Sequence, residues 1–223
     1  MIEQDGEGQK FRNLFLAAKC LNEVRERKEI AAVETQLLER LKELTKYDLH
    51  YHYQPYGEEA NLVNEIRTQA VSAIAFTWKD GAETLPWLKQ CAQSDDNWAV
   101  RQAAVQEIAR GWKDDPQTLP LLKQCAQSDD NSAVRLAAIK EIAWGWKDEP
   151  KIFQWLCDIA INDPFEGQSK FQDNPRQTAL EIMLKQYPDR PKILEILRDR
   201  CANDPDEQVR NFAQKQLAKL EKL

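Results

Sequence analysis

The chain has 223 residues and a mass of 25.9 kDa, which suits one extended domain or two small ones. Its formal net charge of −6 argues against a nucleic-acid partner, because proteins that bind nucleic acid present a basic surface. The mean hydropathy is −0.68 and no apolar run approaches the roughly 18 residues of a membrane span, so no membrane partner is expected. Five widely spread cysteines indicate free thiols, which is typical of a cytoplasmic protein.

Residues 1–60 are predicted to form a helical cap that ends in an aromatic loop. Helical periodicity runs through 11–27 and again through 28–45, whereas the segment YDLHYHYQPYGEEA at 47–60 has none. His50 and His52 in this loop form the only histidine pair, and neighbouring carboxylates could complete a metal site. Since no cysteine is nearby, we favour a packed aromatic loop and expect neither a metal nor another cofactor.

Residues 61–223 contain an internal repeat with a period of 34 residues. The segments 84–116 and 118–150 are identical at 26 of 33 positions without a gap, which excludes chance similarity. Within each copy a short helix opens with a proline in its first turn, a Ser-Asp-Asp-Asn turn follows, and a longer helix ends before Lys-Asp-Asp/Glu-Pro. The second helix recurs five times, and the fourth copy is delayed by an insertion within 165–175. The predicted fold class is therefore all-α, a right-handed α-solenoid of helix pairs.

Three of the second helices open near a Val-Arg pair that follows an aspartate, namely Asp95 with Arg101, Asp129 with Arg135 and Asp204 with Arg210. This pattern resembles the HEAT repeat, and specifically its short bacterial form. The resemblance implies that the aspartates and arginines form a structural ladder between neighbouring repeats. Tryptophan recurs at 78, 112 and 146, four residues after an isoleucine on the same helix face, and is interpreted as core.

No motif in the chain indicates catalysis. The seven glycines form no phosphate-binding loop, and there is no Gly-x-Ser-x-Gly turn. Cys91 and Cys125 occupy the same repeat position, and neither histidine is placed by the sequence to activate a thiol, so both are interpreted as core residues. We expect a protein that is not an enzyme.

Positions at which the near-identical repeats differ are the best candidates for binding a partner. The differences at 98, 102, 106 and 110 lie four residues apart, and therefore form one stripe along the second helix. The apolar side chains of the stripes, Phe76, Trp98, Leu136 and Trp144, are expected to be partly exposed among polar ones. Aromatic and arginine side chains in a polar rim are typical of binding hot spots, although drift on a solvated face would produce the same pattern. The two phenylalanines of the insertion could bind a partner or fold back onto the repeats. The candidate partner-binding residues are Phe76, Trp98, Gln102, Gln106, Arg110, Leu136, Lys140, Trp144, Phe165 and Phe171.

Three segments of the sequence resemble the C-terminal arms of cyanobacterial NACHT-family NTPases. They are QSDDNWAVR at 93–101, WKDDPQTLP at 112–120 and FRNLFLAAKCLNEVRER at 11–27. That resemblance implies a non-catalytic protein-binding scaffold, the arm that senses a ligand or a partner in a NACHT (STAND) NTPase system. The alternative is a HEAT-like subunit of a phycobiliprotein chromophore lyase, which shares only the generic repeat.

Overall fold

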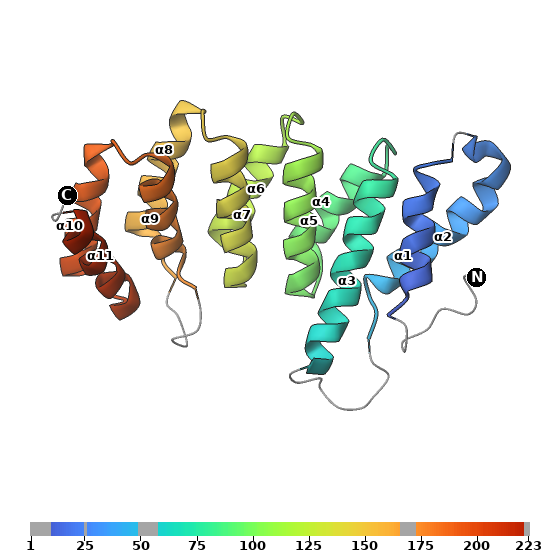
Figure 1. Cartoon of the computed structure of the whole chain (residues 1–223), viewed down its shortest axis with the longest axis horizontal. Helices are drawn as coiled ribbons and strands as arrows, with labels where there is room; N and C mark the ends of the chain where they lie inside the picture. Colours follow the sequence, from blue (N-terminus) through green and yellow to red (C-terminus); the bar gives the residue numbers. More distant parts are fainter. Residues whose placement is uncertain (1–9, 25, 49–57, 166–172, 221–223) are drawn as a thin grey trace. The chain divides into compact units, whose positions relative to one another are not determined.

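A computed structural model of the chain describes residues 10–24, 26–48, 58–165 and 173–220 (Figure 1). In these segments the regular secondary structure is entirely helical, which agrees with the predicted all-α class and is consistent with an α-solenoid. The chain divides into two compact units, an N-terminal unit of residues 1–113 and a C-terminal unit of residues 114–223.

The described part of the N-terminal unit contains the helices of the predicted cap and of the first predicted repeats. Its helices are α1 (Arg12–Leu21), the short 3-10 helix η3 (Arg27–Ile30), α2 (Ala31–Leu44), α3 (Glu58–Thr77), α4 (Thr84–Ser94) and α5 (Trp98–Gly111). The predicted cap packs on the first repeat, because side chains of α1 and α2 share one hydrophobic core with Ile66, Ala70 and Ile74 of α3. The cap thus covers apolar surface that α3 would otherwise expose.

The C-terminal unit continues the pattern of paired helices. Its helices are α6 (Thr118–Ser128), α7 (Ser132–Gly145), α8 (Pro150–Asn162), α9 (Pro175–Gln186), α10 (Pro191–Asn203) and α11 (Glu207–Leu220). Each odd-numbered helix packs on the even-numbered helix that precedes it, and α9 also packs on α7 and α11. The five predicted copies of the second helix are α3, α5, α7, α9 and α11 (Figure 1).

Local sequence signals explain where the helices begin. The side chain of Asn97 accepts hydrogen bonds from the backbone N–H groups of Ala99 and Val100, and thereby caps the first turn of α5. Asn131 and Asn174 cap α7 and α9 in the same way. Helices α8, α9 and α10 each have proline in the first turn, where its missing N–H leaves no hydrogen bond unmade.

Buried ion pairs link neighbouring repeats of the C-terminal unit. Arg176 donates from Nε and Nη2 to the two carboxylate oxygens of Asp204, each at 3.0 Å. Arg135 pairs through Nη2 alone with Asp163, also twenty-eight residues further along the chain, while its Nε donates to the carbonyl of Ala126. The predicted ladder is therefore present between these repeats, with the arginine on one second helix and the aspartate at the end of the next first helix.

The repeated tryptophans are not equally buried. Trp146 lies in the core, as predicted, whereas Trp78 and Trp112 are half-buried. The indole N–H of Trp78 donates to Oε1 of Glu34 at 2.9 Å. An indole needs a polar partner for this group, which keeps one edge of the ring near the surface. The prediction of core positions is therefore correct for Trp146 and too strong for the other two.

Candidate partner-binding surface

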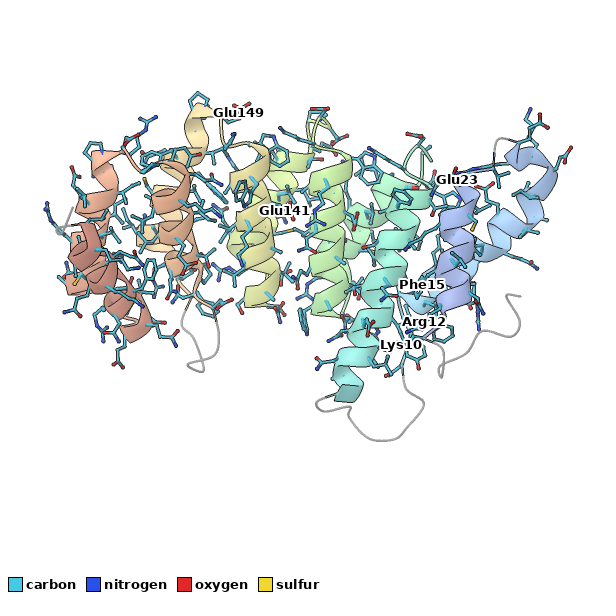
Figure 2. All side chains as sticks on the ribbon, viewed as in Figure 1. Lys10, Arg12, Phe15, Glu23, Glu141 and Glu149 are labelled. Carbon is cyan, nitrogen blue, oxygen red and sulfur yellow. The ribbon has the colours of Figure 1, made fainter. Side chains whose placement is uncertain are left out.

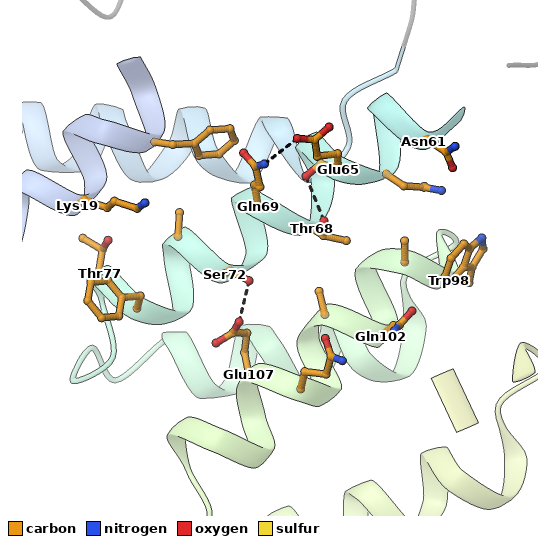
Figure 3. Close-up of a pocket in the computed structure, with 17 residues that line it drawn as sticks. Lys19, Asn61, Glu65, Thr68, Gln69, Ser72, Thr77, Trp98, Gln102 and Glu107 are labelled. Carbon is orange, nitrogen blue, oxygen red and sulfur yellow. Dashed lines mark hydrogen bonds between the residues drawn. The ribbon is translucent and has the colours of Figure 1, made fainter. Parts of the chain in front are cut away.

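A groove of about 950 Å³ lies along α3 and α5 of the N-terminal unit, and α1 flanks it beside α3 (Figure 3). We call it the α3–α5 groove. Four of the candidate binding residues line it, namely Phe76, Trp98, Gln102 and Gln106. The repeat comparison thus selected residues that the fold brings to one concavity, although they lie on two helices.

Two aromatic side chains of this groove are exposed to solvent. Phe76 is 65% exposed and Trp98 is 38% exposed. Trp98 and Thr77, the neighbour of Phe76, lie at opposite ends of the groove in Figure 3. Large apolar side chains that remain in water have no role in folding the helix that carries them, and such surfaces in soluble proteins often bind a partner.

Uncharged polar side chains line the space between the two aromatic residues. The amides of Gln102 and Gln106 are half-exposed and form no hydrogen bond within the part of the chain that the structure describes. The hydroxyl of Ser72 donates to Oε1 of Glu107 at 2.7 Å, and the side-chain amide of Asn97 donates to Oδ1 of Asn64 at 3.2 Å. These two bonds join α3 to α5 and to Asn97, the residue that caps α5, and they set the position of α5 along α3.

The charged groups of the groove are few and mostly acidic. Glu65 forms an exposed ion pair of 2.9 Å with Lys10, which is labelled in Figure 2, and also accepts a hydrogen bond from Gln69. Glu107 is half-buried, and among the described residues its carboxylate has the hydroxyl of Ser72 as its hydrogen-bond donor. Lys19 is the basic residue of the lining. The groove therefore carries two carboxylates and one ammonium group.

The corresponding stripe of the C-terminal unit is different. Trp144 is 56% exposed, and the ammonium group of Lys185 on α9 lies 5.2 Å from the centre of its ring. Lys140 is exposed, as expected, but Leu136 is only 5% exposed, so its predicted exposure is wrong. The leucine side chain has no polar end to keep in water, and α7 is packed against both α6 and α9.

The remaining candidates do not join the groove. Arg110 is exposed near the end of α5 and is absent from the groove lining. Phe165 folds back onto the ladder, because its carbonyl accepts a hydrogen bond of 2.9 Å from Arg176 and its ring lies 5.9 Å from the guanidinium carbon of Arg135. Of the two alternatives for this phenylalanine, the structure favours the one in which it packs on the repeats. Phe171 lies outside the described residues.

Sequence reasoning missed several residues of the groove. Phe15 and Lys19 reach it from α1, and no repeat signal connects that helix with α3 or α5. The repeat comparison does not indicate Glu107, because its repeat equivalent, Glu141, is also a glutamate and only positions that differ between the repeats were candidates. A search for identical polar residues on the same helix face would have found it.

Metal and thiol chemistry find no support in the described residues. No cluster of three or more histidine, cysteine, aspartate or glutamate side chains there could hold a metal ion, and His50 and His52 lie outside that part. Burial, with a smaller contribution from Asp95, raises the pKa of Cys91 to about 12. Its sulfur is therefore a protonated thiol at neutral pH, as expected of a core residue.

Comparison with known proteins identifies the repeat type. A family model described as HEAT repeats matches residues 64–143 and again 85–169. No curated protein and no solved structure matches the chain. Within the described residues, no helix is both long enough and apolar enough to cross a membrane. HEAT repeats are thus detected from α3 to beyond α8, as the aspartate and arginine pattern predicted, and the chain is consistent with a HEAT-like repeat protein.

Proposed function

We propose that the chain is a non-catalytic scaffold that binds a protein partner through the α3–α5 groove, with the exposed stripe of α7 as a separate candidate surface. HEAT repeats suggest a protein-interaction scaffold in general. The observation that carries the proposal for this chain is the pair of exposed aromatic side chains, Phe76 and Trp98, on a wall of uncharged polar groups. An aromatic anchor within a polar rim is the usual composition of a binding hot spot.

Site-specific photocrosslinking in the host cell tests this proposal. Phe76 and Trp98 are each replaced by p-benzoylphenylalanine, which preserves an aromatic ring at an exposed position. After irradiation, mass spectrometry identifies the proteins that are covalently attached. The proposal expects the same protein from both positions, because both line one groove.

The matched control is the same replacement at Val33, which is 48% exposed on α2 and does not line the groove. A protein captured equally from Val33 is a non-specific neighbour. The absence of any adduct specific to Phe76 and Trp98 contradicts the proposed function.

The finer proposal is that the partner belongs to a NACHT (STAND) NTPase system, in which this chain is the sensor arm. Its support is the sequence resemblance at 11–27, 93–101 and 112–120. Sequencing the genomic DNA beside the gene tests it, since an adjacent NTPase with a phosphate-binding loop is expected. Phycobiliprotein genes at that place would instead favour the chromophore-lyase alternative.

A further inference from the structure

This inference rests on the proposed function and specifies the partner's chemistry. We propose that the α3–α5 groove binds an extended peptide segment of about seven residues. The segment carries an apolar side chain at each end and one basic side chain two residues from the end that contacts Phe76.

The alignment of α3 and α5 follows from the two hydrogen bonds that join them. Asn97 donates to Asn64, which places Trp98 beside the first part of α3. Ser72 donates to Glu107, which places that carboxylate eight residues further along α3. Phe76 lies twelve residues beyond Asn64 on the same helix. The order along the groove is therefore Trp98, Glu107 and Phe76.

The helical rise converts this order into distances. At about 1.5 Å per residue, Glu107 lies roughly 12 Å, and Phe76 roughly 18 Å, along the axis from Trp98. An extended chain advances about 3.3 Å per residue, so these distances correspond to about four and about six residues. The groups that would contact the groove are then the first, fifth and seventh residues of the peptide. All are odd-numbered, and alternate side chains of an extended chain point to the same side.

The lining favours an extended backbone over a helix. An extended peptide leaves its N–H and C=O groups without internal partners, whereas a helix satisfies them itself. The amides of Gln102 and Gln106 offer both donors and acceptors, and form no hydrogen bonds within the described part of the chain. Hydrogen bonds to a peptide backbone supply affinity that does not depend on the peptide sequence.

The charge of the groove selects a basic residue beside Glu107, at the fifth peptide position, whereas the ammonium group of Lys19, which lies near Thr77 in Figure 3, disfavours a basic residue at the seventh. The carboxylate of Glu107 has no ion pair with a described residue, whereas the carboxylate of Glu65 is paired with Lys10. A lysine or arginine at the fifth peptide position would lie beside Glu107 and complement it. An acidic residue there would meet the same carboxylate with like charge, which costs affinity and suppresses the wrong partner.

Fluorescence anisotropy with synthetic peptides and the full chain tests the proposal. The probe is a fluorescein-labelled heptapeptide of the composition Leu-Ser-Ser-Ser-Lys-Ser-Leu, together with its reversed sequence, since a groove can bind a peptide in either direction. A second pair of peptides replaces lysine by glutamate. We expect saturable binding of one lysine peptide, and binding at least about tenfold weaker for its glutamate counterpart.

Chain variants assign the effect to the groove. Trp98→Ala and Phe76→Ser should each weaken binding of the lysine peptide by at least about tenfold. Glu107→Gln should abolish the preference for lysine over glutamate while binding remains. The matched control is Glu141→Gln, the same repeat position on α7 (Figure 2), which lies outside the groove and should leave the preference unchanged. Circular dichroism confirms that each variant remains helical.

Two results overturn the peptide assignment. One is the absence of saturable binding for both lysine peptides, and the other is a lysine preference that survives Glu107→Gln. If photocrosslinking at Phe76 and Trp98 nevertheless captures a specific protein, the scaffold proposal stands and only the peptide chemistry is wrong. If crosslinking fails but the lysine peptide binds as described, the groove's chemistry stands and the cellular role is wrong.

Discussion

The second helices α5 and α7 have closely similar sequences but present different surfaces. Their buried residues correspond, so that Val100, Ala104 and Ile108 of α5 have the equivalents Val134, Ala138 and Ile142, and all six are buried. On the stripe, however, Gln102 is half-exposed beside a groove, whereas its equivalent Leu136 is buried. The buried face tolerates almost no change because it is close-packed, whereas the stripe is free to vary.

The way in which arginine is used also differs between the two units. In the C-terminal unit Arg135 and Arg176 form buried ion pairs with the aspartates of the next repeat. In the N-terminal unit Nε of Arg67, at the equivalent position of α3, donates instead to the backbone carbonyl of Tyr47 at 2.6 Å. The same residue in the same repeat position thus joins two repeats at Arg135 and Arg176, and at Arg67 contacts the segment that precedes the first repeat.

Removal of a ladder arginine should have the largest effect on stability. Arg176→Ala leaves the carboxylate of Asp204 buried without its main partner, and also removes hydrogen bonds to the carbonyls of Asp163 and Phe165. We expect a loss of roughly 4–5 kcal/mol in the free energy of unfolding, measured by urea denaturation.

The control for this prediction is Arg210→Ala, which removes hydrogen bonds to two carbonyls but no buried ion pair. It should cost roughly 1–2 kcal/mol. Equal losses for the two variants would show that the ladder ion pair contributes nothing beyond its carbonyl contacts.

The three tryptophans near the ends of the second helices separate core from surface. Trp146→Ala removes a buried indole and should cost roughly 3–4 kcal/mol, with Trp112→Ala at about half that value because its side chain is half-buried. Trp144→Ala should cost less than about 1 kcal/mol, since it removes an exposed ring and one cation–π contact with Lys185. Thermal melts rank the three variants, and indistinguishable melting temperatures would refute the division into core and surface positions.

The caps of the second helices should contribute less. Asn174 caps α9 by accepting from the backbone N–H of Arg176, and its amide donates to Asp206 of the next repeat at 2.9 Å. Asn174→Ala should lower the free energy of unfolding by roughly 1–2 kcal/mol, and Asn174→Ser by less, because serine retains a capping oxygen and adds no charge beside Asp206. Urea denaturation of the two variants measures the difference, and a serine variant that is the less stable of the two would contradict the cap as the main contribution.

The cysteines should differ in reactivity without any change in stability. Burial raises the pKa of Cys91 to about 12, so on the order of one molecule in ten thousand carries the thiolate at pH 8. Cys20 is exposed on α1. With a chromogenic disulfide reagent at pH 8, Cys20 should react within minutes and Cys91 only after unfolding, as mass spectrometry of the labelled peptides can establish. Rapid labelling of native Cys91 would mean that α4 opens readily.

The sequence by itself determined the helix pairs and their repetition. Proline in a first turn and asparagine before the second helix act within a few residues, and they therefore predicted helix starts such as Trp98 directly. Periodicity then predicted which face of each helix is buried, as the burial of Val100 and Ile108 confirms. The period of 34 residues predicted the fold class, because a repeated helix pair can bury its apolar face only against its neighbours.

Only the tertiary structure decided which exposed positions lie together. Phe15 and Lys19 of α1 line part of the α3–α5 groove, and the approach of Phe15 to α3 leaves no mark in the repeat pattern. The exposure of Leu136 was mispredicted, and the alternatives for Phe165 were left open, for the same reason. The exposure of each side chain depends on the helices and arginines packed around it. Local signals describe one helix at a time, whereas burial of a surface side chain is set by neighbours that are distant in the sequence.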